Sequence, residues 1–284
     1  MSARRVWVVG GMAWDTVLHL DALPAPGGYA RVRKRFERPG GTAANVAQAV
    51  ASAGVETGFV SSLGNDERGA LLLQTLEASH LAHLAISRYE GESEHVLVLV
   101  QDDGDRTIIG LAGGGEIHLA SVSLDPSDIV VFVAWDQRFG HDLRLANDVG
   151  CTTIVGLGAL GDPDVDSASI AFGSRSDAAP EVFPIEHLDR FERIVVTNAA
   201  EGATQYEATA TLYQPAFGAT VVDTTGAGDA FLAGYLALYA HGLTDGAAAL
   251  EAGARWAAAM VSINASVPPD FATVDGASCL LDSA

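Results

Sequence analysis

Short apolar runs of strand length alternate with longer segments of helical spacing along most of the chain. The run at 6–9 is continuously apolar, whereas 66–79 repeats leucine at helical intervals. This alternation predicts a doubly wound, mostly parallel α/β sheet flanked by helices. Strands are expected at 6–9, 17–20, 58–63, 95–101, 106–111, 129–134, 152–155, 169–172, 193–197 and 211–214, and helices at 40–54, 66–79, 140–149, 184–188, 229–241 and 244–263.

Two insertions, at about 11–39 and 88–111, contain strands but no helix. The first carries a basic, partly alternating segment at 29–38, which is typical of an exposed strand. The second predicts a β-hairpin around the acidic turn at 102–105. We therefore expect a single domain over 1–284, with a small second sheet as a lid over a substrate cleft. The exposed edge of this lid is expected to pair with a second copy of the chain, giving a homodimer.

The chain is strongly acidic, with a formal net charge of −20 over 284 residues. Such a field repels nucleic acid and anionic lipid, so neither is an expected partner. No apolar run is as long as a membrane span, and no signal peptide precedes the first strand, so we expect a cytoplasmic protein. The two cysteines, Cys151 and Cys279, form neither a disulfide framework nor a zinc-binding spacing.

Lysine usage excludes several classes of phosphoryl-transfer enzyme. Lys34 is the only lysine, and it lies in a basic stretch rather than in a glycine-rich loop. P-loop NTPases and protein kinases place a lysine at the phosphates, and pyridoxal enzymes need a lysine for the Schiff base. Any phosphoryl transfer by this chain must therefore use an anion site built without lysine.

The stretch Asp223-Thr224-Thr225-Gly226-Ala227-Gly228-Asp229 offers such a site. Val221-Val222 indicates the end of a strand, and the residues after the turn predict a helix. The turn puts the N–H groups of Ala227, Gly228 and Asp229 at a helix N-terminus, where the helix dipole favours an anion, and Gly226 and Gly228 allow close approach of the backbone. The side chain of Asp229 is placed beside them to take a proton from an attacking hydroxyl. Alternatively, Asp229 is an ordinary N-cap and the glycines only form a turn.

This stretch resembles the second signature, DTxGAGD, of the PfkB (ribokinase-like) carbohydrate kinase family. Residues 40–54, with Gly40, Gly41 and Asn45, resemble the first signature of that family. Two signatures in this order, together with the insertions, are similar to the family over nearly the whole chain. The nearest branch is that of the ketohexokinases and sulfofructose kinases. The resemblance implies a ribokinase-like fold and an ATP-dependent, Mg²⁺-assisted sugar kinase with Asp229 as base.

The resemblance also assigns roles to residues elsewhere in the chain. Those expected to bind the sugar are Asp15, Gly40, Gly41, Asn45 and Arg106, and those expected to bind the nucleotide are Thr197, Asn198, Gly202, Thr225 and Asn264. Asp223 and Thr225 match positions that hold K⁺ in potassium-dependent members of the family. The structural alternatives are a solvated turn for Asp15, a helix start with a surface asparagine for Gly40, Gly41 and Asn45, a surface arginine for Arg106, and a capping aspartate and a turn threonine for Asp223 and Thr225.

Three departures from the family pattern concern the nucleotide side. Ala199 stands where the family has the first glycine of a T-x-G-x-x-G turn. The N-x-x-E motif that organises Mg²⁺ is missing from 171–177. Either Asp177 substitutes for it through water, or Mg²⁺ is held by water and phosphates alone. The segment 264–269 replaces the R-x-G-A turn that borders the adenine.

The sequence leaves the acceptor open. A free keto- or aldo-sugar is favoured, and a nucleoside is the main rival. A phosphosugar would need a cationic cluster, which Arg31, Arg33, Lys34 and Arg35 offer from the lid. Two other classes are a catalytically silent sugar- or nucleotide-binding protein on the same fold and, last, a Rossmann-type oxidoreductase, which lacks its glycine fingerprint.

Overall fold

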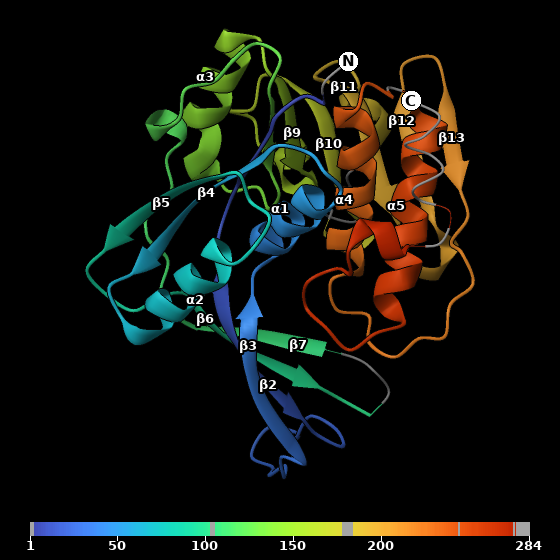
Figure 1. Ribbon diagram of the computed structural model, residues 1–284. Helices are drawn as coiled ribbons and strands as arrows, with labels where there is room; N and C mark the ends of the chain where they lie inside the picture. Colours follow the sequence, from blue (N-terminus) through green and yellow to red (C-terminus); the bar gives the residue numbers. More distant parts are fainter. Residues whose placement is uncertain (1–2, 103–105, 178–183, 244, 275, 277–284) are drawn as a thin grey trace.

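A large sheet forms the centre of the computed structural model, which describes residues 3–102, 106–177, 184–243, 245–274 and 276 (Figure 1). Its strands, in spatial order, are β13 (Thr211–Gln214), β12 (Ala203–Glu207), β11 (Phe191–Thr197), β10 (Ala168–Ser174), β9 (Thr152–Gly156), β8 (Ile129–Phe132), β1 (Val6–Val9), β4 (Thr57–Gly64) and β5 (His83–Tyr89). The strands from β11 to β5 are parallel, and β12 and β13 are antiparallel additions at one edge.

Strand β1 lies at the point where the strand order reverses, because it pairs with β4 on one side and β8 on the other. The carboxyl end of such a strand is where α/β sheets bind ligands. Gly10 and Gly11 follow β1 directly, so the chain turns there into the small sheet.

Helices cover both faces of the large sheet. The alternating side chains of β1 show this, since Val6 and Val8 join one core and Trp7 and Val9 the other. The first core contains side chains of α1 (Thr42–Ser52), α2 (Glu67–Glu77), α4 (Ala227–Ala240) and α5 (Gly246–Val261), and the second contains those of α3 (Gly140–Val149). Across the described ranges, no helix has the length and apolar character that crossing a bilayer requires.

Helices α4 and α5 lie unusually close together, which fixes the start of α4. A Cβ on Gly234 would lie 2.7 Å from the carbonyl oxygen of Ala252, and one on Gly253 would lie 2.7 Å from the Phe231 ring. Only glycine allows this contact at these two positions. The first turn of α4, which carries Asp229, is therefore held on a rigid helix pair.

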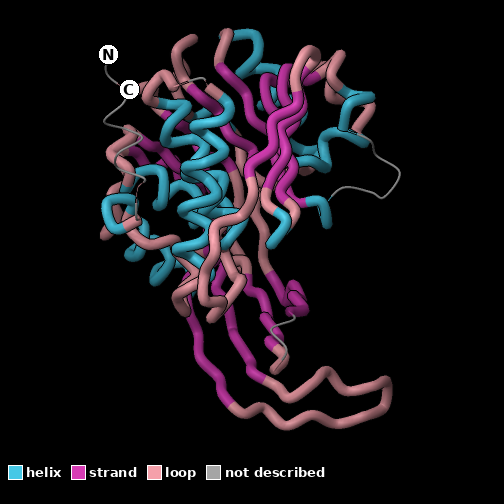
Figure 2. The backbone as a smooth tube through the Cα atoms, turned by 90° about the vertical axis from the view of Figure 1, so that its right-hand side faces the viewer, coloured by secondary structure: helices cyan, strands magenta, loops and turns pink. Residues whose placement is uncertain are grey.

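The small sheet extends from one end of the body (Figures 1 and 2). It consists of β3 (Lys34–Gly40), β2 (Ala13–His19), β6 (His95–Val100) and β7 (Arg106–Ala112), with β2 and β6 parallel and the other pairs antiparallel. The pairing places Asp15 directly opposite Arg38. The two predicted insertions thus form one separate sheet, as expected.

Several predicted elements differ from the structure. Residues 29–33 lie outside β3, and 88–89 belong to β5, a strand of the large sheet that the pattern did not reveal. Strand β12 was also missed, and 184–188 forms only a short 3-10 turn, Pro184–His187. The expected strand before the Gly226 turn is absent from the described 215–226, where Val221 and Val222 are 64% and 59% exposed.

Candidate functional site

The two family-like segments meet at the carboxyl end of β1. Asn45, in the first turn of α1, donates a 2.8 Å hydrogen bond from Nδ2 to Oδ2 of Asp229, in the first turn of α4. These residues are 184 positions apart in the chain. The structure therefore brings together the predicted sugar-contacting asparagine and the predicted base.

The turn before α4 leaves several backbone donors unpaired. Gly226 has a left-handed φ of 75° and is the N-cap of α4. Among the described residues, the N–H groups of Gly226, Gly228 and Asp229 have no backbone partner, and that of Ala227 makes only a long bond, 3.4 Å, to Thr224. No atom lies within 4 Å of where a Cβ on Gly228 would be. The turn is thus open on the side where an anion would bind.

Asp229 has an unusual protonation equilibrium. Burial raises its pKa from 3.8 to about 6, and the negative charge of Asp15 acts in the same direction. The hydrogen bond from Asn45 and the charge of Arg106 oppose the shift. A carboxylate with a pKa of about 6 is ionised at neutral pH and still basic enough to accept a proton. Arg106 is exposed, so its role here is electrostatic.

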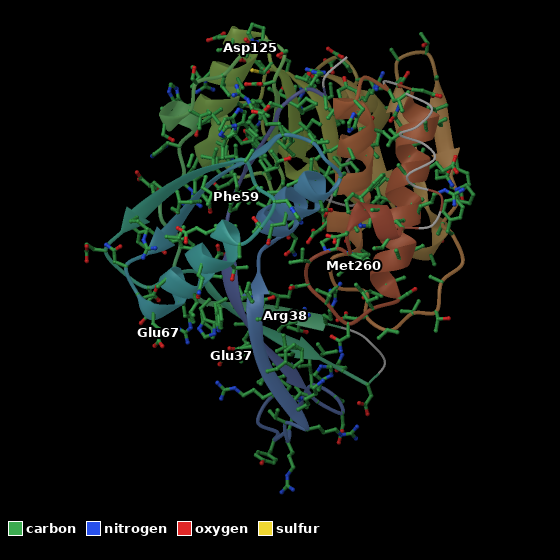
Figure 3. All side chains as sticks on the ribbon, viewed as in Figure 1. Glu37, Arg38, Phe59, Glu67, Asp125 and Met260 are labelled. Carbon is green, nitrogen blue, oxygen red and sulfur yellow. The ribbon has the colours of Figure 1, made fainter. Side chains whose placement is uncertain are left out.

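Asp15 lies in β2 of the small sheet, and it is 7% exposed. The Nε of Arg38 lies 3.8 Å from its Oδ2, yet burial and the nearby Glu94 raise the pKa of Asp15 to about 6. A Cβ on Gly40 would clash with the carboxylate of Asp15, so this position requires glycine. Figure 3 shows Arg38 where the small sheet meets the body.

Gly41 completes the turn between β3 and α1. Its φ is 101°, and a Cβ there would lie 2.8 Å from Cα of Met12. The turn after β1 and the turn before α1 are therefore in backbone contact. Next to them, Oδ1 of Asn45 is buried and has no hydrogen-bond partner in the described part of the chain. A buried acceptor without a donor is a group that a ligand hydroxyl can satisfy.

Three residues at this site were missed by the sequence analysis. They are Arg38 and Glu94, described above, and Ser266, whose Oγ donates a 2.9 Å hydrogen bond to the carbonyl oxygen of Pro39. Ser266 also borders the anion turn, because its carbonyl oxygen would lie 3.0 Å from a Cβ on Gly226. The sequence pattern does not reveal the role of a single charged or hydroxyl residue next to a strand, because that role depends on which strands are paired.

Three of the residues predicted to bind the nucleotide, Thr197, Asn198 and Gly202, lie in a turn at the end of β11. Thr197 ends that strand, Asn198 donates a 2.7 Å backbone hydrogen bond to Gly202, and its side chain bonds Glu201. Ala199, in place of the family's glycine, is the only described non-glycine residue with a positive φ, 45°. The turn therefore keeps a glycine-like backbone with an alanine side chain.

The predicted ion-binding residues make local contacts. Oδ1 of Asp223 accepts hydrogen bonds from the N–H and Oγ1 of Thr225 at 2.8 and 2.7 Å. Oδ2 of Asp177 accepts one from the N–H of Ser174 at 2.8 Å. Asn264 is exposed near the end of α5. Within the described ranges, no group of three or more His, Cys, Asp or Glu side chains could hold a metal.

Half of the cationic cluster considered for a phosphosugar is paired. Arg33 forms ion pairs with Asp21 and Asp102, and Arg35 forms one with Glu37. The charges of Arg33 and Arg35 are thus offset by acidic residues, whereas Arg31 and Lys34 form no ion pair with the described residues.

Comparisons with known proteins identify the family of this chain. A family model described as pfkB family carbohydrate kinase matches residues 3–121 and 170–267. An ATP-dependent ribose-1-phosphate kinase of Halopiger xanaduensis is 31% identical over 85% of this chain and 86% of that protein. A fructokinase of Salmonella typhimurium is 29% identical over 87% of this chain and 88% of that protein.

Solved structures share the fold. Arabidopsis thaliana ribokinase complexed with ribose and ATP has a TM-score of 0.77 at 23% identity, over 99% of both chains. Burkholderia thailandensis nucleoside kinase in complex with inosine has a TM-score of 0.82 at 19% identity, over 98% of this chain and 96% of that one. The predicted ribokinase-like fold and the predicted kinase class are confirmed. The chain belongs to the pfkB family of carbohydrate kinases and is a phosphotransferase that acts on a sugar or nucleoside.

Proposed function

We propose that the protein transfers the γ-phosphoryl group of ATP to a hydroxyl of a free sugar, with Asp229 as the general base. Asp229 accepts the hydroxyl proton while the oxygen attacks phosphorus in line, and ADP leaves. The free N–H groups of Gly226, Gly228 and Asp229 stabilise charge on the transferring group. Asn45 holds the Asp229 carboxylate in position and, with Asp15 and Gly41, orients the sugar.

The observation that carries this proposal is the position of Asp229 beside unpaired backbone donors at the start of α4. The free N–H groups favour a negative charge, but burial and the nearby charge of Asp15 disfavour the ionised Asp229 and raise its pKa to about 6. The arrangement supports a catalytic function rather than a silent binding protein, because a binding protein has no need of a base there.

The remaining nucleotide contacts are part of the same proposal. The turn of Thr197, Asn198 and Gly202, together with Thr225 and Asn264, borders the nucleotide. Mg²⁺ takes few protein ligands and retains waters and phosphate oxygens, and Asp177 would hold it through water. Bound there, Mg²⁺ would neutralise charge on the phosphate oxygens.

Asp223 and Thr225 are the proposed K⁺ ligands, although both already share a hydrogen bond. Oxygen ligands of this kind suit a hard monovalent cation. A several-fold rise in turnover when Na⁺ is replaced by K⁺ at constant ionic strength supports the assignment. Equal rates in the two salts contradict it.

A sugar phosphate is the second candidate acceptor, and the name of the 31% identical relative, a ribose-1-phosphate kinase, favours it. A nucleoside is the third, because nucleoside kinases are among the relatives and structural neighbours.

The experiment is ADP release from ATP and Mg²⁺ across free sugars, sugar phosphates and nucleosides, with Asp229→Ala as the blank. Turnover on one acceptor that the variant lacks supports the proposed reaction. Silence across the panel, with ATP still bound, contradicts it and favours a binding protein.

We also propose that two chains associate through the small sheet. Its edge strand β7 exposes Ile108 and Leu111, which are 65% and 51% exposed. An unpaired apolar edge invites pairing with another chain. Light scattering coupled to gel filtration should show a dimer, and Ile108→Lys should convert it to a monomer. A wild-type monomer at high concentration contradicts the proposal.

A further inference from the structure

Glu94 lies beside the glycine turn that follows β1, and its charge acts on Asp15. Asn45, which bonds Asp229, donates its backbone N–H to the carbonyl oxygen of Gly41 at 3.0 Å. A Cβ on Gly41 would lie 2.9 Å from the carbonyl oxygen of Gly11, and a Cβ on Gly11 would lie 2.6 Å from Oε2 of Glu94. A continuous series of contacts thus leads from the base to Glu94 past the two turns.

The Glu94 carboxylate has no structural use that the structure reveals. The side chain is half-buried, and in the described part of the chain it accepts no hydrogen bond and forms no ion pair. Burial raises its pKa, and Arg138 opposes this only from a distance, since Arg138 is itself bound to both carboxylate oxygens of Asp136. The backbone carbonyl of Glu94, not its side chain, bonds the N–H of Trp14 at 2.8 Å.

The surroundings of Glu94 are also rich in acceptors. The charge of Glu94 acts on Asp15, and the charge of Asp15 acts on Asp229. Oδ1 of Asn45 lacks a donor within the described ranges, and Arg38 is already directed to Asp15. Such a wall complements a molecule with many hydrogen-bond donors and no negative charge.

We propose that Glu94 is a specificity-determining residue. Its carboxylate accepts hydrogen bonds from hydroxyls at the end of the sugar opposite the reacting hydroxyl, and it excludes acceptors that carry a phosphate at that end. The inference rests on the proposed sugar kinase activity. It separates this chain in acceptor choice from its ribose-1-phosphate kinase relative.

The physical basis is a difference between two ligands at one carboxylate. A hydroxyl gives Glu94 the donor it lacks, whereas a phosphate places two further negative charges beside Glu94 and Asp15. Repulsion between neighbouring, partly buried like charges lowers the affinity for the phosphorylated sugar by roughly tenfold or more. Of the four cations at 31–35, Arg33 and Arg35 are already paired with acidic residues and offer a phosphate little compensation.

The test compares D-ribose with ribose 1-phosphate, and D-fructose with fructose 1-phosphate, in wild type and three variants. Glu94→Gln keeps the shape of the side chain and removes its charge. Glu94→Asp keeps the charge and retracts the carboxylate by one methylene. Glu92→Gln removes a charge from the same segment, where Glu92 is exposed, and is the matched control.

For Glu94→Gln we expect KM for the free sugar to rise about tenfold, with kcat nearly unchanged. The ratio of kcat/KM for free sugar over its 1-phosphate should fall about tenfold or more. Glu94→Asp should raise KM and keep the discrimination, and Glu92→Gln should match wild type. If Glu94→Gln does not fold, Glu94→Asp alone carries the KM test.

Two results overturn the inference while leaving the kinase intact. One is an active wild type whose KM and acceptor ratio are the same in Glu94→Gln. The other is a wild type that prefers the 1-phosphate. A wild type inactive on every sugar and sugar phosphate overturns the proposed function, and the inference with it.

Discussion

Replacing Asp229 by asparagine should abolish turnover and at the same time stabilise the fold. Burial gives this carboxyl a pKa of about 6 in the folded chain against 3.8 for the ordinary group. The folded state therefore binds the proton more tightly than the unfolded state does. The stability contributed by this group is complete below pH 3.8 and is lost as pH rises through about 6.

The magnitude follows from the size of the shift. About two pKa units at 1.36 kcal/mol each make the ionised carboxylate cost about 3 kcal/mol of stability at pH 8. The hydrogen bond from Asn45 is already among the causes that set this pKa, and the asparagine side chain of the variant would still accept it. The net gain for Asp229→Asn is then about 3 kcal/mol at pH 8 and close to zero at pH 4.

The assay is urea denaturation of both proteins at pH 8 and pH 4 in the same salt, together with turnover at pH 8. A matched control is Asp245→Asn, which removes the same charge from the N-cap of α5, where Asn caps as well as Asp. We expect Asp245→Asn to leave the free energy of unfolding unchanged at both pH values. Turnover of Asp229→Asn should fall by roughly two to four orders of magnitude. An equal stability difference at pH 8 and pH 4, or near-normal turnover, would refute the reasoning.

Two further predictions concern the acceptor side. Gly41→Ala should destabilise the fold by about 3 kcal/mol or more, because it combines a left-handed φ with a backbone clash. Gly54→Ala is the control: its φ is 78° but the space around it is open, so it should cost about 1 kcal/mol. Equal denaturation midpoints for the two variants would contradict the contact at Gly41. Arg38→Gln removes the nearest positive charge from Asp15, so the pKa of Asp15 should rise above about 6 and KM for the sugar should increase more at pH 6.5 than at pH 8.5. A KM ratio between variant and wild type that does not change with pH would count against that role.

The fold and the class of enzyme could be predicted because their signals are local. The turn at Gly226–Asp229 and the helix after it are specified within a few residues, and strand–helix alternation indicates the large sheet. Membership in the family and the fold are confirmed, whereas the individual roles of the site residues stay predictions. The contact between Asn45 and Asp229 agrees with them, but geometry alone does not establish a reaction.

The misses have physical reasons too. Val221 and Val222 have strand-type side chains, yet they lie exposed in a loop, and the pattern cannot distinguish apolar residues in a core from apolar residues at a surface. Residues 29–33 alternate like a strand, but β2, opposite them, ends at His19. The carbonyl oxygen of His19 accepts a hydrogen bond from the N–H of Arg33, and the described part of the chain continues this pairing no further toward residue 29. Glu94 and Arg38 acquire meaning only when β2, β3 and β6 are paired, which a single sequence does not reveal.

The hydrogen bond from Ser266 to Pro39 has a consequence for the order of events at the site. Ser266 belongs to the segment beside the anion turn, and Pro39 lies at the end of the strand that leads into the glycines proposed to bind the sugar. A ligand that immobilises one of these segments removes part of the entropy cost of immobilising the other. Binding on the two sides should therefore be positively coupled, and thermodynamic reciprocity requires each substrate to tighten the other by the same factor.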